Sequence, residues 1–393
     1  MKNVRSMWAT ALVAMILGAC GGGGGGGGGI GGTGRSDGTM HVLMTDAPSC
    51  GYDHVYVTVD RVRVNQSSSA ADSDTGWSEV VVSPARRIDL LSLTNGVVED
   101  LGSTQLPAGK YTQMRLVLVD NSSSTPLANS VVPTGGSETP LDTPSAQQSG
   151  LKINVDLDVA ADQVADVVID FDACKSVVKR GNSGKYNLKP VLTATPLVSD
   201  AGMRVVGYVD PALGVSSTLV SVQASGVPVK ATVPDATGKF VLYPVPAGTY
   251  DLVVTAPGRV TAVMTGVPVV TTAFTTLNST ALPIVPPTAT MRTVTGTVTP
   301  ATATVRATQA LTGGPTIEAA FGAVDAASGD FSFSLPIEAP VKTAYVANPT
   351  TLNFTADSAA AGKYTLQAAS AGATKNQAID VSTTVPSVTF TFP

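Results

Sequence analysis

The chain of 393 residues is poor in charge, aromatic rings, histidine and cysteine. Charged side chains make up 13% of it, whereas globular domains average about 25%. Two histidines and three cysteines leave little material for a histidine-based active site or a metal site of several cysteines. The 29 acidic and 24 basic residues give a net charge of −5, which argues against a nucleic-acid partner. We expect no cofactor and no enzymatic activity.

The N-terminus has an apolar stretch that is too short to cross a bilayer. It runs for 11 residues from Met7 to Leu17, whereas a spanning helix needs about 20. A short apolar run behind basic residues is typical of a signal peptide. Leu17-Gly18-Ala19-Cys20 resembles a bacterial lipobox, in which the peptidase cuts before the cysteine that carries the lipid. We therefore predict a lipoprotein signal peptide at 1–19 and lipidation of Cys20, the alternative being an ordinary secretory signal cut elsewhere.

Glycine is abundant directly after this cysteine. Gly21–Gly29 form an unbroken run, which has no side chains to bury and predicts a flexible tether. We expect residues 20–37 to link a palmitate-type lipid anchor to the folded body. Residue 21 is not the Asp associated with inner-membrane retention. We therefore predict a lipoprotein of the outer membrane in the cell envelope, on either its periplasmic or its outer face.

Beyond the tether, the sequence predicts antiparallel strands. Apolar residues alternate with polar ones over Leu151–Val159, the pattern of a strand with one wet face. The phase of alternation changes between Val59 and Val62, which predicts a β-bulge near Asp60–Arg61. Asn95-Gly96 is a turn signal. One short helix is expected around Asp162–Ala165.

Residues 38–197 resemble the bacterial lipoprotein family known as domain of unknown function 4382. The sequence words that carry the resemblance include residues 43–48, 52–59, 88–96 and 106–116. The family has no established activity, so the resemblance implies architecture and location and no catalytic residue.

Cys50 and Cys174 are the cysteines that remain after lipidation. An exported chain meets an oxidising compartment, so we predict a Cys50–Cys174 disulfide; the alternative is two buried thiols that never meet. Carboxylates are weak candidates for a calcium site, because calcium needs several converging oxygen ligands. Alternating Asp on a strand is more often a solvated face. The weak metal candidates are Asp156, Asp158, Asp170 and Asp172.

The two histidines and the aromatic residues of this region also invite a functional interpretation. His41 and His54 have no nucleophile motif beside them, so we expect partnered strand or surface histidines. Trp77, Tyr52 and Tyr56 are suited to stacking on a sugar ring, but a small β domain also needs aromatic residues in its core, which we favour.

A repeat follows the first region. Thr237-Gly238-Lys239-Phe240 matches Ser328-Gly329-Asp330-Phe331, and Pro246-Ala247-Gly248-Thr249-Tyr250 matches Ala360-Ala361-Gly362-Lys363-Tyr364. The two copies of the second word are separated by more residues than the two copies of the first. This difference predicts an inserted hairpin or loop between Phe333 and Ala360. Residues 203–285 resemble carboxypeptidase regulatory-like domains, which implies a prealbumin-type β-sandwich with a carbohydrate-binding-like fold. Residues 290–393 are a diverged copy.

The predicted fold is therefore all-β, with tandem antiparallel β-sandwiches of the prealbumin or Ig-like type behind the signal peptide and tether. Pro283–Thr288 is expected to be a stiff linker between the last two modules. The leading hypothesis is a non-enzymatic, membrane-anchored lipoprotein that acts as a structural or binding module for another envelope protein. The alternatives are glycan binding through residues 203–285 and a carboxylate- or calcium-dependent enzyme.

Overall fold

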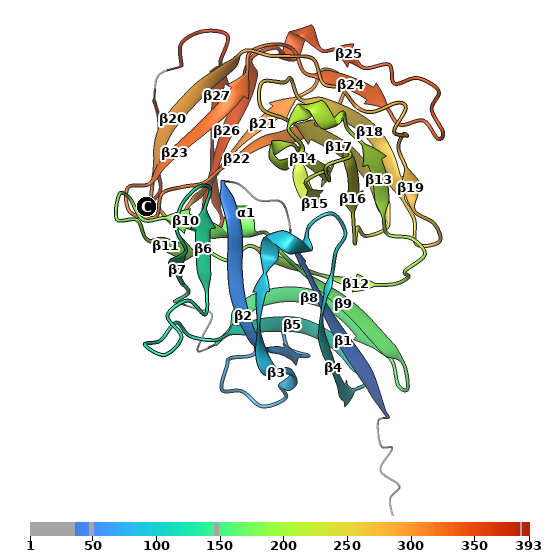
Figure 1. The fold of residues 1–393 in the computed structure, drawn as a ribbon, viewed down its shortest axis with the longest axis vertical. Helices are drawn as coiled ribbons and strands as arrows, with labels where there is room; N and C mark the ends of the chain where they lie inside the picture. Colours follow the sequence, from blue (N-terminus) through green and yellow to red (C-terminus); the bar gives the residue numbers. More distant parts are fainter. Residues whose placement is uncertain (1–35, 47–50, 145–148, 386) are drawn as a thin grey trace, which may run out of the picture. The chain divides into compact units, whose positions relative to one another are not determined.

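The computed structural model describes residues 36–46, 51–144, 149–385 and 387–393. Over these residues the fold is all-β, as predicted, with sandwiches of paired sheets that follow one another along the chain (Figure 1). Three main hydrophobic cores divide the strands into what we call the first, second and third β units. Among the described residues, no helix is long and apolar enough to cross a membrane.

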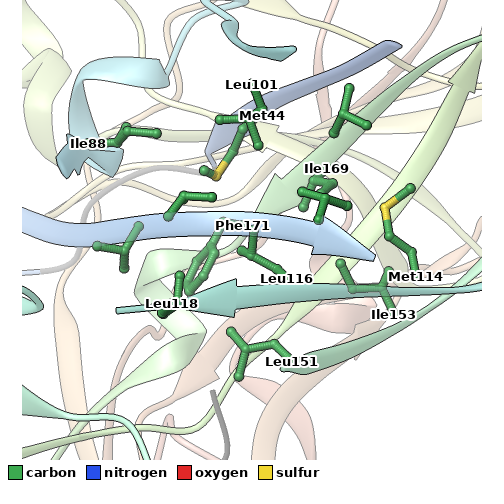
Figure 2. Packing of buried hydrophobic residues seen from close by; sticks show 14 of the residues in the cluster. Met44, Ile88, Leu101, Met114, Leu116, Leu118, Leu151, Ile153, Ile169 and Phe171 are labelled. Carbon is green, nitrogen blue, oxygen red and sulfur yellow. The ribbon is translucent and has the colours of Figure 1, made fainter. Parts of the chain in front are cut away.

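The first β unit packs a sheet in the order β12-β9-β1-β4 against a larger sheet in the order β10-β11-β7-β6-β2-β5-β8, to which β3 adds by pairing with β2. Its core contains Met44, Leu116 and Phe171, all buried side chains (Figure 2). The elements are β1 (Asp37–Asp46), β2 (Tyr52–Asn65), β3 (Ser78–Asp89), η1 (Leu90–Leu93), β4 (Glu99–Pro107), β5 (Gly109–Leu118), β6 (Ser130–Pro133), β7 (Thr139–Asp142), β8 (Leu151–Val159), β9 (Val164–Phe171), α1 (Ala173–Ser176), β10 (Val177–Lys179), β11 (Tyr186–Leu188) and β12 (Leu192–Leu197).

Local sequence patterns predict several details of this unit correctly. Along β8 buried and exposed residues alternate without exception, and the pairing of β2 shifts register between Val59 and Arg61, which confirms the β-bulge. Asn95 and Gly96 both have positive φ, as their turn requires. The helix expected around Asp162–Ala165 is wrong. Asp162 sits in a turn and β9 starts at Val164, because pairing with β1 outweighs any local helical preference.

The second β unit has a three-stranded sheet in the order β16-β13-β19 and a six-stranded sheet in the order β15-β14-β17-β18-β24-β25. Its core includes the buried side chains of Phe240, Leu252 and Met264. The elements before residue 280 are β13 (Val205–Tyr208), η2 (Pro211–Leu213), η3 (Val215–Ser217), β14 (Leu219–Ala224), β15 (Val227–Thr232), β16 (Lys239–Leu242), β17 (Gly248–Thr255), β18 (Ala262–Val269) and β19 (Thr275–Thr276).

The third β unit repeats this plan with sheets in the orders β23-β20-β28 and β22-β21-β26-β27. Phe331, Phe333 and Phe390 pack together in its core. Its elements are β20 (Met291–Thr299), β21 (Thr304–Ala310), β22 (Thr316–Gly322), β23 (Asp330–Pro336), η4 (Ser358–Ala360), β26 (Lys363–Ser370), β27 (Ala373–Asp380) and β28 (Val388–Thr391).

The inserted segment of the last module belongs structurally to the second β unit. It contains β24 (Val341–Ala344) and β25 (Thr355–Ala356). β24 pairs in parallel with β18 (Figure 1). Val341, the first residue of β24, is buried in the second core. Parallel pairs such as β1–β9 and β18–β24 accompany the antiparallel pairs that the sequence predicts, so most of the sheets are mixed, whereas the sheet β22-β21-β26-β27 is wholly antiparallel.

The segment expected to be a stiff linker is instead part of the second unit. Ile284 is completely buried and forms an isolated bridge with Val209, while Thr288 pairs with Arg259. A proline-rich segment is stiff, but it still packs wherever an apolar residue such as Ile284 fills a core position. The linker interpretation of Pro283–Thr288 is therefore wrong.

Candidate functional site

The predicted anchor residue and one predicted disulfide residue cannot be placed. Cys20 and Cys50 lie outside the described residues. Cys174 lies in α1 on the wall of a cavity described below. Lipidation of Cys20 and the Cys50–Cys174 pairing stay predictions.

The four weak metal candidates lie on or directly after strands of two different sheets. Asp156 and Asp158 lie on the exposed face of β8, where Asp156 forms an ion pair of 2.6 Å with Lys110. Asp170 and Asp172 lie at the end of β9, which pairs with β1 and β12 rather than with β8. Among the described residues, no group of three or more His, Cys, Asp or Glu side chains is arranged to hold a metal ion.

Asp170 has a different partner, a buried lysine of the second β unit. Lys230, on β15, is only 3% exposed. Its Nζ lies 2.7 Å from Asp170 Oδ1 and 3.4 Å from the backbone oxygen of Asp46. A buried ammonium group is costly unless a carboxylate compensates it. No local sequence pattern predicts this pair, since its members are 60 residues apart.

Two further carboxylates of the first β unit are buried beside this pair. Asp46 accepts a hydrogen bond of 2.9 Å from the backbone N–H of Ala173, and Asp172 caps α1 by accepting one of 3.0 Å from the N–H of Lys175. Burial raises the pKa of Asp46 well above its usual range, and it raises the pKa of Asp172 as well. The nearby charge of Asp170 adds to both shifts.

The third β unit reaches the same place through Glu318 on β22. Its carboxylate lies 3.4 Å from the Nζ of Lys175 and 3.4 Å from a guanidinium nitrogen of Arg306. Its backbone N–H and carbonyl both bond to the side chain of Gln223 on β14, at 2.8 and 2.9 Å. One glutamate therefore connects all three β units.

We call this group of charges the junction cluster; its members are Asp46, Asp170, Asp172, Lys175, Lys230, Arg306 and Glu318. A cavity of about 130 Å³ adjoins it, lined by Cys174, Lys175 and Glu318 together with apolar side chains that include Val253 and Phe321. A cavity of about 150 Å³ holds a molecule the size of benzene. The carboxylates of Asp170, Asp172 and Glu318 face cations at ion-pair distance, whereas that of Asp46 accepts the N–H of Ala173. The contacts from Lys230 to Asp170 and from Lys175 to Glu318 hold different β units together.

Other contacts join the first β unit to the other two. The backbone N–H of Asn95 donates to Thr232 Oγ1 at 2.8 Å, and its side-chain oxygen accepts from the N–H of Val241 at 2.6 Å. The backbone N–H of Gly181 donates to both carboxylate oxygens of Asp325 at 2.8 and 2.9 Å. Residues 36–393 accordingly form one compact unit by their contacts.

Both histidines are paired with carboxylates, as expected. His41 Nδ1 lies 2.7 Å from Asp166 and its Nε2 lies 3.0 Å from Asp100, while His54 Nδ1 lies 2.6 Å from Asp89. Burial by itself lowers the pKa of His41, but the hydrogen bonds and charges of Asp166 and Asp100 outweigh it and raise that pKa overall.

The aromatic residues considered for sugar stacking are already in contact with protein groups. Trp77 lies beneath the guanidinium groups of Arg63 and Arg115, at 4.7 and 4.9 Å from the ring centre. The ring of Tyr56 contacts Arg87 at 3.7 Å and stacks on His54. Tyr52 packs against the first core and meets Tyr186 edge-on. Of these three aromatic residues, only Tyr52 fits the core assignment favoured from the sequence.

A tyrosine hydrogen bond recurs in all three β units. In the first, Tyr111 donates its hydroxyl to the carbonyl of Pro107 at 2.8 Å, and in the second Tyr250 donates to Pro246 at 2.8 Å. In the third, where alanine replaces the proline, Tyr364 donates to Pro336 at 2.9 Å instead. The word Pro-Ala-Gly-x-Tyr at residues 107–111 was the available signal for this likeness between the first and second units.

Comparison with known proteins supports the resemblance of the first β unit. Residues 37–190 match the family model described as "Domain of unknown function (DUF4382)". None of the curated proteins matches the chain.

Two solved structures are similar over about a fifth of the chain. One is an N-terminal interface mutant of the type II cohesin–X-dockerin complex from Acetivibrio cellulolyticus, 26% identical over 22% of this chain and 59% of that one, with a TM-score of 0.20. The other is the C-terminal interface mutant of that complex, 29% identical over 21% of this chain and 56% of that one, with a TM-score of 0.18. The match spans less than two thirds of either chain.

Proposed function

We propose that this protein is a non-enzymatic lipoprotein of the bacterial cell envelope, which presents a rigid all-β body as a binding module. The observation that carries the proposal is the sequence of residues 17–29, in which Leu17-Gly18-Ala19-Cys20 is followed at once by nine glycines. A lipid on Cys20 anchors the chain, and glycine supplies a flexible connection to β1.

The length of the tether supports this arrangement. The 16 residues from Gly21 to Ser36 have a root-mean-square end-to-end distance of about 20–24 Å if they behave as a glycine-rich coil. The anchor thus keeps the start of β1 close to the outer membrane while leaving the body free to turn toward a partner.

The junction cluster supports a binding role rather than a catalytic one. Two of its ion pairs, Lys230–Asp170 and Lys175–Glu318, join different β units, and Asp172 caps α1, so these carboxylates serve to hold the units in fixed positions. Rigid platforms bind with a smaller entropy cost than jointed ones. The partner that we propose is another protein of the envelope.

Glycan binding by residues 203–285 is the second candidate, and one observation favours it. The resemblance to carboxypeptidase regulatory-like domains includes a carbohydrate-binding-like fold, and Phe274 in this range is 59% exposed. Binding on a glycan array that disappears in Phe274→Ala supports this candidate, whereas silence across a broad array counts against it.

The experiment for the anchor is expression of the full chain in a Gram-negative bacterium, beside Cys20→Ser. We expect the wild-type protein in the membrane fraction, with a first peptide that begins at Cys20 and carries acyl chains by mass spectrometry. Cys20→Ser should lack the acyl mass. An unmodified first peptide that begins at another residue contradicts the lipoprotein proposal.

The experiment for binding is a pull-down from native membranes with the lipidated protein. An envelope protein that is recovered by the wild type, and that also binds the purified chain, supports the binding role. A reproducible hydrolase activity that one point substitution abolishes overturns it.

A further inference from the structure

Four exposed apolar side chains come from segments whose backbones lie next to one another. Val164 is 63% exposed, Val198 73%, Val270 45% and Phe274 59%. They come from the start of β9, the end of β12 and the segment before β19. We call these four residues the apolar surface. Single exposed apolar residues are ordinary, whereas a group rimmed by polar residues marks an interaction site.

Backbone contacts connect the members of this surface. Leu197 pairs with Asp166, which places Val198 beside the first residues of β9. The N–H of Val198 donates to the sulfur of Met203 at 3.4 Å, and the N–H of Met203 donates to the carbonyl of Val270 at 2.8 Å.

Phe274 continues the surface at its far end. It directly precedes Thr275, whose N–H donates to the carbonyl of Arg204 at 2.8 Å, one residue beyond Met203. The surface therefore runs from the first β unit onto the second.

A hollow of about 580 Å³ adjoins the part of this surface that Val164 and Val198 form. Its lining includes Val164 and Val198 together with the carboxylates of Asp156, Asp158 and Asp166, of which Asp156 pairs with Lys110 and Asp166 with His41. Among the described residues that line it, no lysine or arginine is present. Anionic headgroups are repelled by such a wall, whereas electrically neutral ones are not.

The tether enters the body next to the same place. β1 begins at Asp37, whose carbonyl accepts the N–H of Asp162, and Thr39 lies opposite Val164 in the sheet. With a lipid on Cys20, the root-mean-square distance from the anchor to this root is about 20–24 Å. A surface held at that distance meets the bilayer at a high effective concentration, so a weak affinity suffices for contact.

We propose that the apolar surface rests on the bilayer, with Phe274 at the boundary of headgroups and acyl chains, and that it prefers electrically neutral lipids. This inference depends on the lipid anchor of the proposed function. The contact orients the body, because it fixes which face of the three β units is turned away from the membrane. Apolar side chains that enter this boundary are buried by about 5–10 Å.

The test uses the full lipidated chain in vesicles of phosphatidylcholine with brominated acyl chains, which quench tryptophan at that depth. Phe274→Trp reports on the surface. Val81→Trp is the matched control, because Val81 is 62% exposed and lies on β3, which pairs with β2 in the other sheet of the first unit. The wild type supplies the background of Trp77, since processing removes Trp8.

We expect the added tryptophan of Phe274→Trp to be quenched at least about twofold more than that of Val81→Trp. The difference should shrink when phosphatidylglycerol replaces part of the phosphatidylcholine, because the acidic wall then faces anionic headgroups. Equal, weak quenching of both variants on vesicles that carry the protein overturns the inference. Stronger quenching with phosphatidylglycerol overturns the preference for neutral lipids.

Flotation of the vesicles separates this result from the proposed function. If the protein floats with the vesicles and the quenching is equal, the anchor stands and the surface contact is refuted. If the protein does not float, the anchor itself is refuted. A second variant, Val198→Asp, should lower the quenching of Phe274→Trp without releasing the protein from the vesicles, and far-ultraviolet circular dichroism checks that it is folded.

Discussion

Replacing Lys230 by methionine tests whether the junction cluster holds the β units together. Methionine keeps the apolar stem of the side chain and removes the ammonium group that lies 2.7 Å from Asp170. The Asp170 carboxylate, whose side chain is 14% exposed, then loses the cation that compensates it. The junction also loses the bond from Lys230 to the backbone of Asp46.

Removal of one partner from a buried ion pair costs about 3–5 kcal/mol, because the remaining charge stays buried without compensation. Lys230 is 3% exposed, so little solvent screening reduces that cost. We expect Lys230→Met to lower the free energy of unfolding by about this amount, which is at least about a hundredfold in the equilibrium. Urea titration followed by Trp77 fluorescence and by circular dichroism measures the change.

Two matched variants decide how the result is interpreted. Lys110→Met removes an exposed ion pair with Asp156 and should leave the urea midpoint unchanged within error. Lys230→Met combined with Asp170→Leu should recover most of the loss, since apolar replacement of both partners is often neutral. A single variant as stable as the wild type, or a double variant less stable than the single, refutes the reasoning.

The remaining predictions concern three other features. Tyr250→Phe and Tyr364→Phe should each lower the free energy of unfolding by about 0.5–1.5 kcal/mol, as urea titration measures, and a loss in only one unit contradicts their equivalence. His41→Gln should destabilise the protein more at pH 5.5 than at pH 8. Folding raises the pKa of His41, so the protonated imidazole contributes stability below its unfolded-state pKa, and this contribution is lost as the pH rises through its folded-state pKa. Thermal midpoints that shift equally at both pH values contradict this prediction. Mass spectrometry of the unreduced protein should find Cys50 joined to Cys174, and Cys174→Ser should cost about 4–5 kcal/mol in the loop-entropy model; two free thiols refute the bond.

The contacts between the β units have a consequence for binding. The junction cluster, together with the contact between Gly181 and Asp325, limits how the units move against one another. A partner that spans two units therefore meets a surface already arranged for it, which lowers the entropy cost of association.

Several features follow from short stretches of sequence, because their causes are local. Alternation predicts β8, the change of phase predicts the bulge in β2, and Asn95-Gly96 predicts a turn, since each depends on the preferences of neighbouring residues. The internal repeat predicts two related sandwiches. The lipobox-like segment and the glycines after it predict a lipid-anchored location in the cell envelope. These properties need no knowledge of which distant residues meet.

Tertiary structure alone decides the partners of the buried charges and the place of the insertion. Asp170 and Asp172 belong to one acidic run in the sequence, yet Asp170 meets a lysine 60 residues away while Asp172 caps a helix. In the sequence, β24 lies between β23 and β26 of the third unit, but it pairs with β18 of the second. The physical reason is the same in both cases: a buried charge needs an opposite charge and an exposed strand edge needs hydrogen bonds, and either need is met by whichever group folding brings near.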